Sequence, residues 1–317
     1  MQAVILAAGR GSRLRPITDT RSKPMLPILG KPIVERVIEN LALCGLRDFI
    51  LVVNPEDSEI REHFQHNLTM DVNVHFVDQP ERLGMADALM HAAPLISEDF
   101  VLSACDYLVT KEDVRSLINR WGERPDLRGL LSLIRISRED SLKTAIVTLE
   151  GDRVTSIIEK PHPDQALSNI SSLPLYCLSK GILEILPQLQ KSARGEYELQ
   201  DALQMMIREG KIVSGIYFQS YLTLTTAEDL LELNLHLLRS GAGEINIYPS
   251  AVGLNTNIVP PFLIEEGTSI GSGCIIGPDV YIEQNVRIGD DVHIQNAVVL
   301  RQAVIPDGAK LSDLVIT

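Results

Sequence analysis

The chain has 317 residues, of which 45% are hydrophobic, and its formal net charge is −13. This length is comfortable for two domains, and the composition supplies ample apolar surface for their cores. The negative charge argues against nucleic acid or an anionic membrane as a partner, because both are bound through cationic surfaces.

Up to about residue 240, short apolar runs alternate with helical patterns, which predicts a sheet of mostly parallel strands covered by helices on both faces. In chain order, the predicted strands are 3–6, 49–53, 72–77, 100–103, 129–136, 145–149 and 154–159. The predicted helices are 33–41, 197–208 and 227–238. The small residues from Ser240 to Gly243 then predict a linker between a domain of residues 1–240 and a domain of residues 241–317.

Beyond the linker, aliphatic residues recur every six positions. They are Val252, Ile258, Ile264, Ile270, Ile276, Ile282, Ile288, Ile294 and Leu300, and a glycine follows four of them. This is the hexapeptide pattern of a short left-handed parallel β-helix, in which each aliphatic points inward and each glycine occupies a corner. A sandwich of short strands, the alternative, would show a period of two and irregular turn spacing.

Two further observations bear on the class of protein. No apolar run approaches the roughly 20 residues that span a bilayer, and no basic leader precedes Gln2, so we expect a cytoplasmic protein. The four cysteines form no CxxC pair, and the sequence therefore suggests neither a structural zinc nor a disulfide framework.

The most informative segment follows the first predicted strand and reads Leu-Ala-Ala-Gly-Arg-Gly-Ser-Arg-Leu-Arg-Pro over residues 6–16. A loop in this place can direct backbone N–H groups at an anion, and Arg13 and Lys23 add full charges suited to a triphosphate. A dinucleotide-binding loop would need a third glycine where Leu14 stands, and a P-loop would need Gly-Lys-Ser/Thr. Neither of these rival motifs fits.

This segment, with the Lys-Pro-Met-Leu-Pro run that starts at Lys23, resembles the GxGxRLxP…KPM/LP signature of sugar-phosphate nucleotidylyltransferases. It is most similar to the glucose-1-phosphate thymidylyltransferase and UTP–glucose-1-phosphate uridylyltransferase branches. The resemblance implies a Rossmann-like α/β domain with a mixed, mostly parallel sheet, followed by the β-helix. It also implies transfer of a nucleotidyl group from a nucleoside triphosphate, with dTTP or UTP favoured, to a sugar 1-phosphate, with glucose 1-phosphate favoured.

The resemblance extends to the site residues. It assigns catalysis to Arg13, Lys23, Asp106 and Lys160, with Asp106 also holding Mg²⁺. It assigns nucleotide binding to Leu6, Ala8, Gly9, Gly11, Ser12, Gln79 and Gly84, and sugar binding to Ala145, Glu159, Ser172 and Tyr176. The chain departs from the family pattern at three positions: Thr223 stands where a second metal-binding aspartate is usual, and Ala145 and Pro174 replace usual glycines of the sugar half.

Two alternatives follow from these features. The departures suggest a catalytically impaired regulatory or binding paralogue, and the β-helix suggests an acyltransferase. The second alternative is weak, because His293 is the lone histidine of the hexad region. The flat walls of a β-helix also suit assembly, so we expect a homo-oligomer.

Overall fold

The computed structural model describes residues 1–66, 69–241 and 251–317 and divides into two compact units. Unit 1 comprises Met1–Gly9 and Val34–Tyr221, and unit 2 comprises Arg10–Ile33 and Leu222–Thr317. Ala242 and Gly243 of the predicted linker lie outside the described residues, and the predicted domain boundary stays a prediction. Within the described ranges, no helix is both long and apolar enough to cross a membrane.

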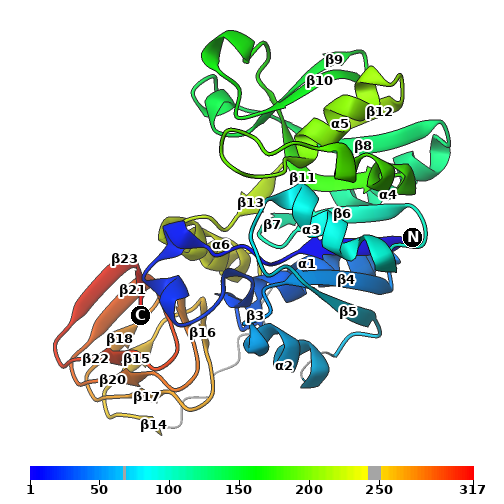
Figure 1. Cartoon of the computed structure of the whole chain (residues 1–317). Coiled ribbons are helices and arrows are strands. Elements are labelled where there is room, and N and C mark those ends of the chain that lie inside the picture. The colour runs from blue at the N-terminus through cyan, green and yellow to red at the C-terminus, as the bar shows by residue number, and fades with distance from the viewer. Residues whose placement is uncertain (67–68, 242–250) are drawn as a thin grey trace. The chain divides into compact units, whose positions relative to one another are not determined.

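Unit 1 is built on one nine-stranded sheet with the order β5-β4-β1-β6-β11-β8-β12-β10-β9 (Figure 1). The strands are β1 (Gln2–Leu6), β4 (Asp48–Val53), β5 (Asn73–Asp78), β6 (Phe100–Ala104), β8 (Leu127–Arg135), β9 (Ala145–Glu150), β10 (Arg153–Glu159), β11 (Ile170–Leu178) and β12 (Ile212–Tyr217). Strands β5, β4, β1 and β6 run parallel, as do β8 and β12, whereas the other pairings are antiparallel. The prediction of a mixed α/β sheet is confirmed, and the antiparallel pairings come from β11 and β10, which run against their neighbours while the other seven strands share one direction.

Alternating residues of the central strands are buried on both faces of the sheet. Val4, Ile50 and Phe100 belong to one apolar cluster with residues of α3 (Met85–Ala92) and α5 (Leu199–Arg208). Their neighbours Ala3 and Phe49 are equally buried toward the other face. The remaining helices of this unit are α1 (Ile33–Leu43), α2 (Ser58–His66) and α4 (Lys111–Glu123). Burial on both faces explains why these strands read as continuous apolar runs rather than alternating ones.

The strand β11 is absent from the sequence prediction although it lies between β6 and β8 in the sheet. It contains Pro174, a residue that normally argues against a central strand because it lacks the N–H needed for a ladder hydrogen bond. The register with β8 shifts between Ser172 and Tyr176, so the proline sits in an irregularity of the ladder. The antiparallel centre of the sheet was therefore not visible in the sequence.

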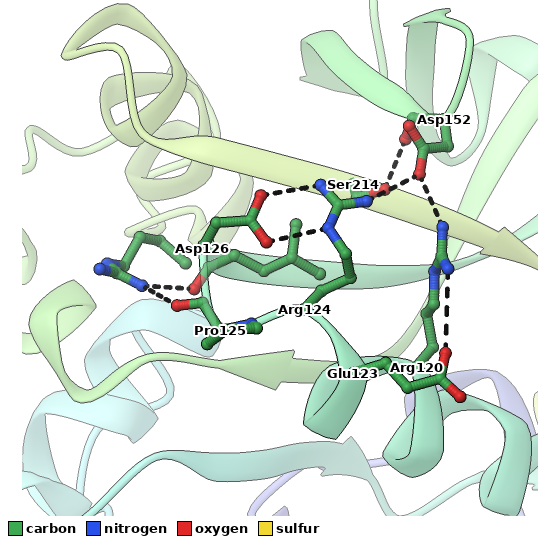
Figure 2. Close-up of polar contacts among 9 residues, drawn as sticks. Arg120, Glu123, Arg124, Pro125, Asp126, Asp152 and Ser214 are labelled. Carbon is green, nitrogen blue, oxygen red and sulfur yellow. Dashed lines mark hydrogen bonds and ion pairs between the residues drawn. The ribbon is translucent and has the colours of Figure 1, made fainter.

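A surface network ties the end of α4 to the β9–β10 turn (Figure 2). The Asp152 carboxylate pairs with Arg120 at 3.1 Å and with Arg124 at 3.4 Å, and Arg124 also forms a fork with Asp126. The backbone oxygen of Asp152 accepts from Ser214 in β12 at 2.8 Å. Although burial opposes ionisation of Asp152, hydrogen bonds and these guanidinium groups lower its pKa overall.

We expect Asp152→Asn to lower the melting temperature at pH 7 by about 1–3 °C, because exposed ion pairs contribute little individually. A carboxylate whose folded pKa is depressed stabilises the protein above its unfolded pKa, and this contribution is lost as pH falls through the folded pKa. The difference between the two proteins should therefore shrink below about pH 4. Thermal unfolding at pH 7 and pH 3 measures this, and a difference that persists unchanged at pH 3 would contradict it.

Unit 2 contains a hairpin, a helix and a C-terminal coil, which we define as residues 251–317. The hairpin joins β2 (Pro27–Ile28) to β3 (Lys31–Pro32), and the helix is α6 (Ala227–Arg239). A side-chain capping box between Thr226 and Asp229 begins α6. Two further short strands outside the main sheet are β7 (Tyr107–Val109) in unit 1 and β13 (Tyr221–Thr223), where the units join.

The coil consists of short parallel strands stacked in three ladders (Figure 1). The ladders contain β14 (Ala251–Val252), β17 (Ser269–Ile270), β20 (Arg287–Ile288) and β22 (Val304–Ile305); β15 (Asn257–Ile258), β18 (Ile275–Ile276) and the start of β21 (His293–Val299); and β16 (Phe262–Ile264), β19 (Val280–Ile282) and the end of β21. The strand β23 (Lys310–Ile316) pairs along the whole of β21. Partners in the first turns are 18 residues apart, three times the six-residue period.

The strand register differs from the predicted six-residue period at one position. Ile264 pairs with Ile282, but Ile282 pairs with Val299 rather than Leu300, because this turn of the coil is one residue shorter. The predicted inward positions from Ile264 to Ile294 are buried, whereas Val252, in the first described turn, is 44% exposed.

The corner glycines of the coil are explained by crowding between successive turns. A Cβ on Gly271 would lie 2.3 Å from the backbone oxygen of Gly289, and one on Gly253 would lie 2.4 Å from the carbonyl carbon of Gly271. No larger residue fits these positions without displacing the next turn. Gly253, Gly271 and Gly289 are thus required by the stacking distance rather than by an unusual φ, whereas Gly277 also has a φ of 103°.

Candidate active site

Several predicted nucleotide-binding residues of unit 1 lie where parallel strands end. Leu6 ends β1, Gln79 follows β5 and Asp106 lies just beyond β6. The backbone N–H of Cys105 donates to the carbonyl of Leu6 at 3.2 Å, and the Arg82 side chain donates to the carbonyl of Ala8 at 2.8 Å. In open α/β sheets this carboxyl edge is where ligands gather. Leu6, Ala8, Gln79 and Asp106 are therefore brought to a common edge.

The Gln79 side chain is held in one orientation. Its amide nitrogen donates to the Asp87 carboxylate at 2.7 Å and to the carbonyl oxygen of Gly84 at 3.2 Å. Both partners are acceptors, so the amide nitrogen must face them. The opposite atom, Oε1, has no hydrogen-bond donor among the described residues. Gln79 thus offers an acceptor to whatever binds at this edge.

Gly84 is needed for packing inside the protein. Its φ is 104°, and an added Cβ would lie 2.6 Å from the backbone oxygen of Tyr197. The backbone N–H of Tyr197 donates to the carbonyl of Leu83 at 2.7 Å, and its oxygen accepts from Ala86. This glycine therefore joins the start of α3 to the segment before α5. Its predicted contact with a base stays a prediction.

The predicted sugar half is assembled by the β9–β10 hairpin. Glu159, the last residue of β10, pairs with Ala145, the first residue of β9, and the N–H of Lys160 donates to the carbonyl of Thr144 at 3.1 Å. Lys160 has a φ of 42°, a left-handed conformation that costs a non-glycine residue about 1 kcal/mol or more. Such strain is concentrated at functional sites, and here it fixes where the Lys160 side chain leaves the hairpin.

Arg194 is a further member of this cluster for which the sequence prediction gave no role. Its guanidinium lies 2.7 Å from Glu198, 3.6 Å from Glu159 and 3.9 Å from Glu196. The Lys160 ammonium is 3.9 Å from the same Glu159 oxygen. Burial raises the pKa of Glu159, and Lys160 and Arg194 oppose that rise. Two cations thus lie near one oxygen of a half-buried carboxylate. Lys160 was predicted from the family resemblance, whereas Arg194 was not among the predicted site residues.

The two remaining sugar residues form a pair inside unit 1. The hydroxyl groups of Ser172 and Tyr176 lie 3.0 Å apart, and both side chains are buried. Tyr176 is fully buried, which raises the pKa of its phenol far above the usual range. In this arrangement neither hydroxyl faces solvent, and sugar binding by these two residues stays a prediction.

Gly11, Ser12, Arg13 and Lys23 belong to unit 2. Ser12 and Arg13 lie in one short 3₁₀ helix, and Lys23 opens another. Gly11 connects them, since its φ is 64° and an added Cβ would lie 2.9 Å from the Cβ of Lys23. The hydroxyl of Thr18 donates to the carbonyl of Gly11 at 2.8 Å. The exposed Arg13 and half-buried Lys23 are thus held on one compact loop, and Gly9 precedes it at the end of the unit 1 segment.

Asp106 and Thr223 stand at the two positions that the family resemblance relates to Mg²⁺. No group of three or more His, Cys, Asp or Glu side chains that could enclose a metal exists in the described part of the chain. Mg²⁺ in phosphoryl-transfer sites typically takes one or two carboxylates together with substrate phosphates. Asp106, at a strand end, fits an ion that binds together with a nucleotide. Thr223 offers a neutral hydroxyl, which lies 3.2 Å from that of Thr225.

A mixed sheet with these polar residues at its carboxyl edge places the chain among the α/β proteins whose ligands bind at that edge. Residues 2–240 match the family model "Nucleotidyl transferase", and residues 258–317 match the model "GMPPB C-terminal domain". The chain therefore belongs to the nucleotidyl transferase family.

Two individual proteins are also similar to this chain in sequence. The bifunctional protein GlmU of Methanococcus aeolicus is 32% identical over 85% of this chain, and the match spans 62% of that protein's length. The chain thus spans less than two thirds of such relatives. The UTP–glucose-1-phosphate uridylyltransferase AglF of Haloferax volcanii is 32% identical over 68% of this chain and 87% of its own length.

A solved structure shows the same fold. UDP-glucose pyrophosphorylase complexed with UDP-glucose superposes with a TM-score of 0.69 at 21% identity, over 75% of this chain and 98% of that one.

Proposed function

We propose that this protein transfers a nucleotidyl group from a nucleoside triphosphate to a sugar 1-phosphate and releases pyrophosphate. The observation that carries the proposal is the placement of Lys160 and Arg194 at 3.9 Å and 3.6 Å from the same Glu159 oxygen. The half-buried Glu159 carboxylate can accept hydrogen bonds from sugar hydroxyls, and the adjacent cations suit the sugar's phosphate. The relatives named for glucose-1-phosphate uridylyl transfer support glucose 1-phosphate as the acceptor.

In the proposed reaction, an oxygen of the sugar phosphate attacks the α-phosphorus of the nucleotide. A new P–O bond forms as the bond to the β-phosphate breaks, and its electron pair leaves with pyrophosphate. Catalysis of such a transfer consists mainly of positioning and of neutralising charge. Lys160 and Arg194 hold the attacking phosphate, Arg13 meets the triphosphate and leaving pyrophosphate, and Lys23 lies against the reacting phosphates.

Asp106 would hold Mg²⁺ in this scheme. When bound, the ion neutralises charge between the attacking and leaving groups. Thr223 in place of a second carboxylate leaves more of the ion's coordination to the nucleotide phosphates.

Orientation of Gln79 supports dTTP or UTP as the nucleotide. Uracil and thymine present a single donor, N3–H, on their base-pairing edge, and Oε1 of Gln79 is an acceptor. Cytosine has an acceptor at N3, which would face the Oε1 acceptor of Gln79 without forming a hydrogen bond. The proposed selectivity therefore depends on Asp87, which fixes the direction of the amide.

We expect Asp87→Asn to relax this selectivity, because an asparagine can donate as well as accept and so permits the Gln79 amide to rotate. The ratio of kcat/KM for UTP to that for CTP should fall by about tenfold. His91→Gln is a matched control, since His91 lies 3.8 Å from Asp87 but does not touch Gln79 in the described contacts. An unchanged ratio in Asp87→Asn would show that Asp87 does not set the choice of base.

The test of the function itself is a matrix of triphosphates against sugar 1-phosphates, read by pyrophosphate release. Turnover with dTTP or UTP and glucose 1-phosphate is the expected result. The departures at Thr223, Ala145 and Pro174 motivate the second candidate, a regulatory paralogue that binds nucleotide sugars without turnover. Binding of nucleotide with no turnover in any combination would favour that candidate and reject catalysis.

We also propose that the C-terminal coil is a left-handed β-helix of the hexapeptide type and that it assembles the protein into a homo-oligomer. The 18-residue register and the corner glycines support the first point. The regular, flat ladders of the coil support the second, because such walls can pack against a second copy.

A further inference from the structure

A buried ion pair joins the loop that carries Arg13 and Lys23 to the C-terminal coil. The Arg21 guanidinium lies 2.6 Å from Oε1 of Glu283, and the two side chains are 5% and 7% exposed. These residues are 262 positions apart in the chain. Both belong to unit 2, and Arg21 stands two residues before Lys23. Removing one partner of such a pair leaves an uncompensated buried charge, so the contact is strongly constraining.

Glu283 is itself fixed by the coil. It follows β19, and its second carboxylate oxygen accepts from the backbone N–H of Arg301 in the next turn at 2.8 Å. Its own backbone N–H donates to Val299 at 2.8 Å. The Glu283 carboxylate therefore has little conformational freedom, and the ion pair forms only where Arg21 reaches it. The register of the coil thus determines where the Arg21 segment lies.

The same loop also lies close to the coil one turn earlier, at Glu265. Glu265, 18 residues before Glu283, accepts from the Tyr281 hydroxyl at 2.5 Å and lies beside Gly30 at the tip of the β2–β3 hairpin. Burial and the nearby Glu283 raise the pKa of Glu265, whereas Arg21 acts in the opposite direction. Arg21 thus lies in the field of two stacked carboxylates.

The hairpin is also held by α6. Asn234 is fully buried, accepts from the N–H of Leu29 at 2.8 Å and donates to the carbonyl of Pro27 at 3.2 Å. The loop from Arg10 to Ile33 is therefore bound to α6 and lies against two turns of the coil. Gly11 packs against Lys23. The contacts that fix the loop therefore also restrict the position of the short helix that contains Arg13.

From these contacts we propose that Arg21 and Glu283 are positioning residues for the triphosphate, through which the C-terminal coil sets the place of Lys23 and Arg13. This inference rests on the proposed function of those two cations. The coil then acts as part of the nucleotide-binding apparatus in addition to any role in assembly. Displacement of a phosphate-binding group by about 1 Å can cost up to a hundredfold in rate.

The test uses the full chain with Arg21→Met, Glu283→Gln and the double variant Arg21→Met/Glu283→Met. Each single variant should raise the KM for the nucleoside triphosphate by about tenfold or more and leave the KM for sugar phosphate within about twofold. The double variant should recover part of the loss, because two apolar side chains of similar volume can replace a buried pair while the Arg301 N–H loses its Glu283 acceptor. Arg239→Met is the matched control, since it removes an exposed α6–coil ion pair of 2.9 Å.

Amide hydrogen exchange supplies a readout that does not depend on turnover. Peptides covering residues 10–33 should exchange about tenfold faster in Glu283→Gln than in the wild type or in Arg239→Met. If kcat falls with the folded fraction while both KM values and this exchange stay unchanged, the pair is merely structural and the inference is wrong. If the wild type shows no turnover, the proposed function fails separately, and exchange in residues 10–33 alone decides whether the coil positions the loop.

Discussion

Replacing Asp106 by asparagine should reduce turnover by about a thousandfold while leaving the fold intact. Asp106 lies beyond the buried strand β6 and is only partly buried, so neutralising it removes little packing. In the proposed site, however, it is the carboxylate assigned to the metal, and Thr223 brings no second charge. The loss should therefore be larger than in a site where two carboxylates share the ion.

The measurement is pyrophosphate release against magnesium concentration for the wild type and Asp106→Asn. Asp48→Asn is a matched control, because Asp48 begins β4 at the opposite end of the sheet and its carboxylate accepts only from Asn73 in the described contacts. Wild-type turnover in a folded Asp106→Asn protein would remove Asp106 from the site. A loss of equal size in Asp48→Asn would point to general charge effects instead.

The strands β1, β4 and β6 could be predicted because they are buried on both faces and read as apolar runs. Gln79 and Asp106 were supplied by the family resemblance, and each lies just beyond a strand. The strand β11 was missed, since its proline argues against a central position and only the β-bulge of the folded ladder accommodates it. Local sequence patterns predict a helix or strand well when its residues have the matching secondary-structure propensity.

Contacts between distant segments were beyond such reasoning. The pairing of Arg21 with Glu283 has no local sequence signal, and Asp87 reads as an ordinary helix residue until its carboxylate is found 2.7 Å from Gln79. Similarly, the six-residue period located the coil but could not show that one turn is shortened before Val299. The sequence thus indicated the residues proposed to contact the reacting groups, but not the residues that orient them.

Lys160→Met should lower kcat/KM for the sugar phosphate by about a hundredfold, through loss of a charge-assisted contact with its phosphate. Methionine keeps the length of the side chain and pays the same backbone cost at a φ of 42°, so the hairpin should still form. The KM for the nucleoside triphosphate should change much less, because Lys160 leaves the hairpin beside Glu159 and Arg194 rather than beside Gln79.

Lys143→Met provides the comparison, since Lys143 precedes the same hairpin but is 73% exposed and pairs only with Asp140 in the described contacts. Steady-state kinetics with each substrate varied in turn separate the two KM values. A larger effect of Lys160→Met on the triphosphate than on the sugar phosphate would reverse the assignment and place the nucleotide at the Glu159 end of the site. A residual rate well above background is also expected, because Arg194 remains 3.6 Å from Glu159 and can hold the attacking phosphate alone. Only the further change Arg194→Met should then remove that residual rate.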